Sequence, residues 1–311
     1  MRFLSKACIV GAAMASLMMC GLALAGESGP TFKSADIGHG ITLHYAEQGT
    51  GQPLILIHGS LSDYSYWRDQ IGPLAKHYRV IAYSRRYNYP NKNPAQPGYS
   101  AITDADDLAA LISTLHLGRV YVIGHSYGAL TTLFMASRHP ELLKAVVLAE
   151  APLVPLLCDL SGSEAAEGIS VFADIQRRMV LPMRAAFAKG DREQGVATFI
   201  NYVFADPMGW QKMSRDSQAG TLRDAHEWDV MLTTGTLFPA LAPADIRAIK
   251  LPVLIMSGGK SYTFLGLIDR ELARLLPDNR HVMFLDAGHQ MWLQHPDEAR
   301  DDSEKFFQAH P

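Results

Sequence analysis

The segment 119–130, which reads RVYVIGHSYGAL, constrains the fold more than any other part of the chain. Residues 120–123 form a short apolar run of β-branched and aromatic residues, which is typical of a strand buried on both faces. The residues that follow open a helix. Where a strand turns straight into a helix, only glycine fits beside the strained central residue, which accounts for Gly124 and Gly128. The segment therefore predicts a tight strand–turn–helix unit centred on Ser126.

This turn gives Ser126 the position of a nucleophile. The hydroxyl group is lifted above the carboxyl edge of the sheet, at the N-terminus of the next helix, where N–H groups and the helix dipole favour a developing negative charge. A glycine-rich turn can also simply join a strand to a helix, and a bare G-x-S-x-G pattern occurs by chance. The strand and helix patterns on its two sides favour the catalytic interpretation.

The composition is that of a globular protein that does not bind nucleic acid. The chain has 311 residues, of which 48% are hydrophobic, enough to bury a full core in one domain with an inserted subdomain. Its 28 basic and 31 acidic residues give a net charge of −3. Because no basic cluster follows the first few residues, no nucleic-acid partner is expected.

Residues 1–25 have the pattern of a secretory signal peptide, so the mature protein is expected to be periplasmic or secreted. Arg2 and Lys6 precede an apolar segment over 9–24, and small residues at 23 and 25 mark a cleavage site. A transmembrane anchor needs about 20 apolar residues. This run is shorter and is interrupted by glycine and serine, so no stable membrane span is expected after cleavage.

The cysteine of the mature chain is not expected to form an internal disulfide bond. Cleavage after residue 25 would remove Cys8 and Cys20, and Cys158 would remain as the single thiol in an oxidising compartment, without a disulfide partner. We expect Cys158 to be buried and inert. A lipid-modified Cys20 is the alternative to cleavage after residue 25, although Met19 fits such a site poorly.

Strand and helix patterns alternate along most of the remaining chain. We expect strands at 31–35, 41–47, 53–57, 79–84, 120–123, 143–149, 252–257 and 281–285, and helices at 63–74, 103–115, 129–137, 265–276 and 296–308. Thr103 is expected to cap the second of these helices. The alternation implies an α/β fold with a parallel sheet, whose ligand site lies at the carboxyl ends of the strands.

The alternation stops after residue 152 and resumes at residue 246. Residues 153–245 read as helical segments rich in aromatic side chains, so we expect a helical cap inserted into a core formed by 26–152 and 246–311. Trp210 and Trp228 could line an apolar pocket, although packing within the cap explains them equally well.

A serine nucleophile needs a base, and His289 is the predicted one. It follows the last strand in the sequence Asp-Ala-Gly-His, which places it on a loop at the same sheet edge as Ser126. His58 and His125 also fall at strand ends. His58 is equally explained as a structural hydrogen-bonding residue.

The base in turn needs a carboxylate partner, and the usual position for that carboxylate holds a different residue in this sequence. A G-x-x-D turn is expected after the penultimate strand, but the residues there are Gly-Gly-Lys-Ser, with Ser261 in the acid position. Glu150 follows the strand next to the nucleophile strand, and neighbouring strands lie about 4.8 Å apart. We therefore predict Glu150 as the acid. A capping or arginine-pairing role for Glu150 is the alternative, and Asp286 and Asp269 are weaker candidates.

Two backbone N–H groups are expected to bind the oxyanion. The loop after the third strand supplies one of them in this architecture, and the residue after the nucleophile supplies the other. These are the N–H groups of Ser60 and Tyr127. The sequence does not indicate which residues bind the rest of the substrate.

Four motifs resemble those of the α/β-hydrolase fold superfamily, namely LILIHGS at 54–60, RVIAYSRR at 79–86, GHSYGA at 124–129 and DAGHQMW at 286–292. The resemblance implies a mostly parallel eight-stranded sheet flanked by helices, with the cap between strands six and seven. An acid after strand six is similar to that of some haloalkane dehalogenases and zearalenone-type lactone hydrolases. Dehalogenases and epoxide hydrolases, however, carry aspartate where this chain has Ser126.

A second departure from the superfamily lies at 84–90, which reads SRRYNYP where relatives commonly have D-x-R-G-x-G. The lost glycines and added aromatic residues predict a differently shaped loop near the mouth of the pocket.

Together these features predict an exported serine hydrolase that cleaves a small apolar ester or lactone through an acyl-enzyme intermediate. The mechanism requires no metal or organic cofactor. A carbon–carbon bond hydrolase or a perhydrolase would use the same triad. The absence of an aspartate at position 261 favours a different alternative, a small-molecule binding protein with little turnover.

Overall fold

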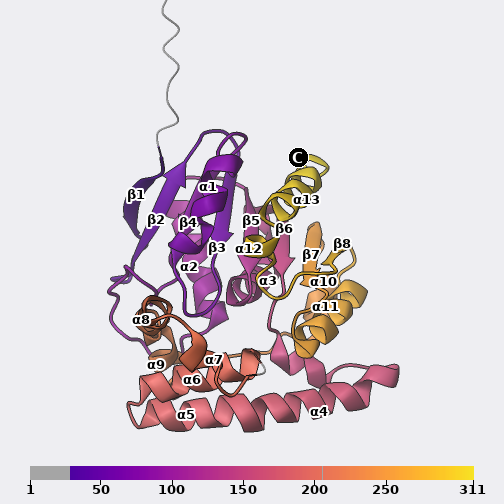
Figure 1. The fold of residues 1–311 in the computed structure, drawn as a ribbon. Coiled ribbons are helices and arrows are strands. Elements are labelled where there is room, and N and C mark those ends of the chain that lie inside the picture. Colours follow the sequence, from indigo (N-terminus) through magenta and orange to yellow (C-terminus); the bar gives the residue numbers. More distant parts are fainter. Residues whose placement is uncertain (1–28, 205) are drawn as a thin grey trace, which may run out of the picture.

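The computed structural model describes residues 29–204 and 206–311 and is built around one eight-stranded sheet (Figure 1). The strand order is β1-β2-β4-β3-β5-β6-β7-β8, and β2 pairs antiparallel with both β1 and β4, whereas the remaining pairs are parallel. The predicted α/β fold with a mostly parallel sheet is confirmed. The predicted signal peptide, with Cys8 and Cys20, lies outside the described residues. The strands are β1 (Thr31–Asp36), β2 (Thr42–Gln48), β3 (Pro53–Ile57), β4 (Arg79–Tyr83), β5 (Val120–His125), β6 (Leu143–Ala149), β7 (Val253–Gly258) and β8 (Asn279–Phe284).

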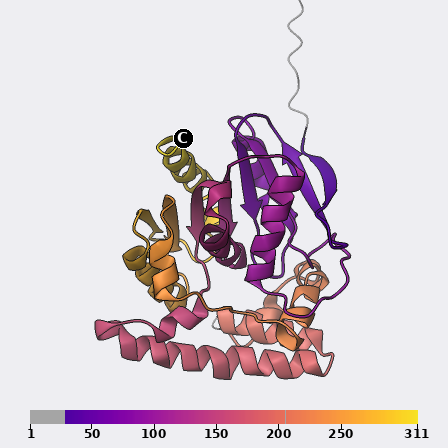
Figure 2. The ribbon, with the colours of Figure 1, turned by 180° about the vertical axis from the view of Figure 1, so that it is seen from behind.

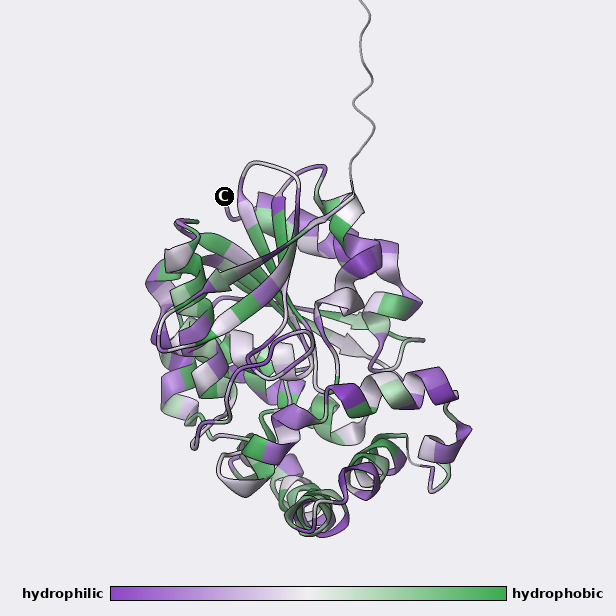
Figure 3. Cartoon of the chain, turned by 90° about the vertical axis from the view of Figure 1, so that its left-hand side faces the viewer, coloured by the Kyte–Doolittle hydropathy of each residue, from purple (hydrophilic) through white to green (hydrophobic). Residues whose placement is uncertain are grey.

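Helices cover both faces of the sheet, and this is why the central strands are apolar throughout. All residues of β5 are buried. The face seen in Figure 2 is covered by α2 (Ala101–Thr114) and α3 (Tyr127–Arg138), and the same core includes residues of α11 (Thr263–Leu275). The opposite face packs on α1 (Arg68–Leu74), α12 (Met291–Gln294) and α13 (Pro296–Gln308). Figure 3 shows the strands as mainly hydrophobic and the helices as carrying both kinds of residue.

The chain between β6 and β7 folds into helices that lie across one end of the sheet, at the bottom of Figure 1. They are α4 (Ala165–Ile175), a π-helical turn (Gln176–Val180), α5 (Leu181–Ala188), α6 (Arg192–Val203), α7 (Gly209–Lys212), α8 (Arg215–Arg223) and α9 (His226–Thr233). Helix α10 (Pro243–Ala248) follows and packs on α3 and α11. The π-helical turn stands directly before Pro182, which has no N–H group to continue the helical hydrogen bonds. Helices α4 to α9 form the part that we call the cap. No helix in the described part of the chain is both long and apolar enough to span a membrane.

Two local predictions were wrong. The cap residue of α2 is Ser100, whose side chain accepts a hydrogen bond from Ile102 N–H, while Thr103 completes a capping box from the first helical turn. Ser100 and Thr103 stand one turn apart and a capping box uses both hydroxyl groups, so the cap residue lies three positions before the predicted Thr103. Cys158 is exposed instead of buried, because it ends a short 3₁₀ helix at the surface.

Candidate active site

Ser126 occupies the tight turn predicted between β5 and α3. Its backbone has φ 54° and ψ −120°, a conformation that L-residues adopt only under strain. The glycines around it are sterically required: a Cβ atom at Gly128 would lie 2.3 Å from the Ile57 carbonyl oxygen, and one at Gly124 would lie 2.4 Å from the Gly128 carbonyl oxygen. The strained turn therefore presents Ser126 at the start of α3, beyond the end of β5.

Glu150 follows β6 directly, is fully buried, and has φ 55°. Its carboxylate accepts a hydrogen bond from His289 Nδ1, one of 2.7 Å from the Ser261 hydroxyl, and one of 2.8 Å from the Gly258 N–H. The turn after β7, where an aspartate was missing from the sequence, thus provides two donors that hold Glu150. Ser261 supports the acid from the position that the acid commonly occupies.

His289 lies on the loop after β8, with its ring between those of Tyr262 and His125. The ring centroids are 5.4 Å and 4.7 Å from that of His289, respectively. Ser126 and His289 line the same cavity. Within the described residues no hydrogen bond joins the Ser126 hydroxyl to His289, a contact that often shortens only when substrate is bound. The structure brings Glu150 and His289 together beside Ser126, and their catalytic roles stay predictions.

His125 is buried and cannot act as the base. Burial and the nearby His289 lower the pKa of the His125 imidazole from 6.5 to about 3, so the ring is neutral. Its Nε2 lies 2.8 Å from the His289 carbonyl oxygen, and a neutral ring with its proton on Nε2 donates to that oxygen. The ring also stacks on Tyr66 at 5.0 Å between centroids. His125 therefore fixes the backbone of the loop that carries His289.

The two predicted oxyanion donors lie on the two sides of Ser126. Tyr127 is the first residue of α3, so its N–H has no acceptor within the helix. Ser60 lies on the loop after β3, which approaches so closely that a Cβ atom at Gly59 would be 3.0 Å from Ser126 Cβ. In the described part of the chain no backbone acceptor is assigned to the Ser60 N–H. Both residues line the cavity that contains Ser126.

This cavity, of about 510 Å³, lies between the sheet edge and the cap. The lining is mainly apolar. From the cap it includes Met179, Phe199, Ile200, Val203, Phe204, Met213 and Trp228, and from the chain after α9 it includes Leu237 and Phe238. Arg68 is the charged residue among the described lining residues, and it is exposed. Trp228 thus lines the pocket, whereas Trp210 does not. The arrangement suits a small molecule with an apolar body whose reacting carbonyl faces Ser126.

A model of the alpha/beta hydrolase fold family matches residues 52–296 of this chain. The chain belongs to that family. The chain is 28% identical over 260 residues to 2-(acetamidomethylene)succinate hydrolase of Mesorhizobium japonicum, with 83% of this chain and 88% of the relative covered. It is 27% identical over 272 residues to 2-hydroxy-6-oxo-6-(2'-aminophenyl)hexa-2,4-dienoic acid hydrolase of Metapseudomonas resinovorans, with 83% and 85% covered.

Solved structures share the fold. The enol-lactonase from Burkholderia xenovorans LB400 superimposes on this chain with a TM-score of 0.69 at 21% identity, over 89% of this chain and 100% of the other. Carboxylesterase CesB from Bacillus subtilis gives a TM-score of 0.68 at 17% identity, over 90% and 92% of the two chains. At these identities the likeness concerns the fold.

The weaker candidates for the catalytic acid, Asp286 and Asp269, do not contact His289 in the described structure. Asp286 is exposed and pairs with His295 at 3.2 Å. Asp269 is buried on α11 and accepts a hydrogen bond of 2.5 Å from the Ser257 hydroxyl. His58 is buried and bonds to the backbone at Gly59 and Arg85, as a structural residue does. No group of three or more His, Cys, Asp or Glu side chains in the described ranges could hold a metal ion.

The loop 84–90 was expected near the mouth of the pocket; none of its residues lines the cavity that contains Ser126, although Arg85 contacts the lining residues Gly59 and Tyr127. Tyr89 and Pro90 line a separate surface hollow of about 620 Å³ beside β2, which contains none of the candidate catalytic residues. Arg85 and Arg86 turn inward and are buried. Sequence reasoning missed Arg85 and its cap partner Glu227, since charged residues in a loop and in an amphipathic helix normally indicate solvent exposure.

Proposed function

We propose that this protein is a serine hydrolase that cleaves a small, neutral carboxylic ester or lactone through an acyl-enzyme intermediate. The observation that carries the proposal is the buried Glu150 carboxylate bound to His289 Nδ1, next to a serine held at φ 54° in the cavity wall. A carboxylate on Nδ1 leaves Nε2 of the imidazole free to take a proton.

Each of these residues has a separate role in the proposed reaction. Ser126 Oγ attacks the carbonyl carbon while His289 Nε2 takes the hydroxyl proton, and Glu150 stabilises the imidazolium that forms. The N–H groups of Ser60 and Tyr127 bind the oxyanion. His289 then protonates the leaving alkoxide. A water molecule, deprotonated by His289, attacks the acyl-enzyme, releases the acid and restores Ser126.

The cavity lining favours neutral substrates. The two curated relatives above are named for substrates that bear carboxylate groups. A carboxylate bound inside an apolar cavity requires a buried cation or several donors. Among the described lining residues the cation is Arg68, which is exposed, so we infer an uncharged acyl group.

A carbon–carbon bond hydrolase is the second candidate. The dienoic acid hydrolase that this chain resembles favours it, and such a reaction would use the same serine and histidine. Cleavage of a vinylogous 1,5-diketone without cleavage of any ester would support this candidate over the ester hydrolase.

A fluorophosphonate probe tests the nucleophile. We expect the wild-type protein to be labelled at Ser126, Ser126→Ala to be unlabelled, and His289→Ala to react at least 100-fold more slowly. A series of p-nitrophenyl esters and lactones then defines the substrate. An unlabelled wild-type protein that hydrolyses nothing in the series but binds one of these compounds would replace the hydrolase by a binding protein.

We also propose that the protein is exported, with residues 1–25 removed. Expression in a Gram-negative host should place the activity in the periplasmic or culture fraction, with a mature N-terminus at Gly26. A variant lacking residues 2–25 serves as the control and should stay in the cytoplasm. Equal distributions of the two proteins would contradict export.

A further inference from the structure

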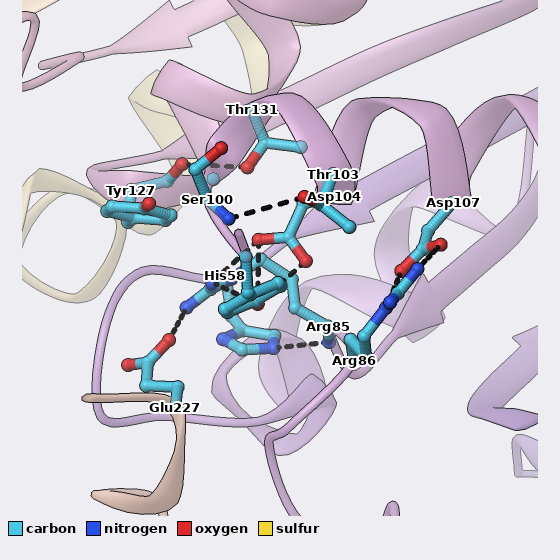
Figure 4. A network of polar contacts seen from close by, with 12 residues as sticks. His58, Arg85, Arg86, Ser100, Thr103, Asp104, Asp107, Tyr127, Thr131 and Glu227 are labelled. Atoms are coloured by element: carbon cyan, nitrogen blue, oxygen red, sulfur yellow. Dashed lines mark hydrogen bonds and ion pairs between the residues drawn. The ribbon is translucent and has the colours of Figure 1, made fainter. Parts of the chain in front are cut away.

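Arg85 is a fully buried arginine just after β4, and it binds the loop that carries Ser60. Figure 4 shows its ion pairs with Asp104 and Glu227. Its Nη2 donates a hydrogen bond of 3.1 Å to the Gly59 carbonyl oxygen, and its guanidinium carbon lies 4.7 Å from the centre of the Tyr127 ring. Asp104 on α2 accepts from Nη1 at 3.0 Å. One side chain thus contacts both residues that flank the oxyanion site, Gly59 and Tyr127.

Glu227 on α9 of the cap is the second member of this arrangement and is also fully buried. One carboxylate oxygen accepts from Arg85 Nη2, and the other accepts a hydrogen bond of 2.6 Å from the Leu61 N–H. The ion pair joins residues that are 142 positions apart in the chain. A cap side chain therefore reaches the loop 59–61 of the core.

These contacts fix the direction of the Ser60 N–H. The Gly59 carbonyl and the Ser60 N–H belong to one planar trans peptide, in which the two bonds point in opposite directions. The Gly59 oxygen receives Arg85 on one side of this peptide, and His58 Nδ1 lies 2.8 Å from it as a second contact. Glu227 holds the next peptide through the Leu61 N–H. With both peptides held, the Ser60 N–H keeps one direction, opposite to that of the Gly59 carbonyl.

A buried ion pair is poorly explained by stability alone, because well-packed apolar residues often stabilise a core as well or better. We propose that Arg85 and Glu227 are positioning residues of the oxyanion hole. They orient the Ser60 N–H so that it can donate to the oxyanion only when the cap is docked on the core. This inference rests on the proposed serine hydrolase function.

Two variants disrupt the Arg85–Glu227 ion pair with little change in side-chain volume. In Glu227→Gln the amide oxygen is drawn to the Arg85 guanidinium, so the amide nitrogen faces the Leu61 N–H and that donor loses its acceptor. In Arg85→Lys the charge remains, but a single ammonium cannot reach Gly59, Asp104 and Glu227 together. Asp107→Asn is the matched control, since Asp107 pairs with buried Arg86, the residue next to Arg85 in the chain, and makes no hydrogen bond to residues 59–61 in the described structure. Asp229→Asn, on α9 itself, tests the effect of perturbing that helix.

The first readout is the ratio of kcat for a p-nitrophenyl ester to kcat for its thionoester. Sulfur accepts hydrogen bonds poorly, so this ratio reports the strength of the oxyanion hole. We expect Glu227→Gln and Arg85→Lys to lower kcat for the ester 10- to 100-fold, to change KM less than threefold, and to lower the ratio at least fivefold. The two control variants should keep the wild-type ratio. An unchanged ratio in both test variants, or an equal fall in Asp107→Asn, overturns the proposal.

The second readout does not depend on turnover. Hydrogen exchange of a peptide covering residues 58–62 should be at least tenfold faster in Glu227→Gln than in the wild type and in Asp107→Asn, under conditions where all three proteins are folded. Unchanged exchange in this peptide would show that Glu227 does not hold the loop and would overturn the inference. If the wild-type protein hydrolyses no ester and resists the fluorophosphonate, the proposed function fails, and the exchange measurement still decides whether the ion pair holds the loop.

Discussion

Glu150 is the residue on which the proposed chemistry depends most. Replacing it by glutamine keeps the volume and the hydrogen bond from Gly258 but removes the charge that orients and stabilises the His289 imidazolium. We expect Glu150→Gln to lower kcat by about 10²- to 10⁴-fold. The measurement is steady-state kinetics on the best ester. Asp286→Asn serves as the control, because Asp286 pairs with His295 at the surface, and a larger loss in this variant would move the acid to Asp286.

His125 links stability to pH. Its folded-state pKa of about 3 lies below the ordinary value of 6.5, so between these values the unfolded chain binds the proton and the folded chain does not. Stability from this residue is therefore complete above pH 6.5 and falls as the pH drops toward 3, by about 1.4 kcal/mol per pH unit. His125→Asn should lose that slope. Urea unfolding of both proteins between pH 4 and 7 measures it, and parallel pH dependences would contradict a neutral buried His125.

At the scale of single residues, the sequence allowed us to predict the candidate catalytic side chains that follow strands of the sheet. Ser126 and Glu150 each stand directly after a buried apolar strand, His289 lies on the loop after the partly exposed strand β8, and parallel strands bring their carboxyl ends to one edge. Arg85 and Glu227 gave no such signal. Their pairing depends on how the cap docks, which no local pattern encodes.

At the scale of elements, the turn between β5 and α3 tolerates no side chain beside the strand. Gly128→Ala would place a methyl group 2.3 Å from the Ile57 carbonyl oxygen, and we expect a loss of about 2–4 kcal/mol in unfolding free energy. Gly220→Ala is the matched change in helix α8, where a Cβ atom meets nothing within 4 Å, and it should stabilise by up to about 1 kcal/mol. Chemical denaturation compares the two, and a neutral Gly128→Ala would refute the steric argument.

Elements with strong periodicity were predictable, and elements set by tertiary or side-chain chemistry were not. The central strands β3 to β7 followed from apolar runs, because a strand that is buried on both faces consists almost entirely of apolar residues. The start of α2 was misplaced because Ser100 and Thr103 cap the helix jointly. The continuation of α4 through a π-helical turn into α5 was not foreseen, since Pro182 normally indicates a helix end.

At the scale of the whole molecule, the lining of the cavity between core and cap predicts a preference for uncharged acyl groups. Because the described lining is mainly apolar, p-nitrophenyl hexanoate should be hydrolysed at least tenfold faster, in kcat/KM, than the p-nitrophenyl monoester of adipic acid. The two acyl groups have the same length and differ in the terminal carboxylate. Equal rates would point to a cation that accompanies the substrate into the cavity, with Arg68 the first residue to replace.

The cap as an insertion was foreseen from the loss of strand pattern after residue 152, but its docking was not, since the contacts that seat it lie far apart in sequence. The cap leaves the core after β6 and returns before β7, and these two strands are paired neighbours in the sheet. Its two ends therefore emerge side by side. Recombination could exchange this segment for that of a relative and so reassign specificity in one event, provided that the incoming segment supplies a carboxylate where Glu227 stands.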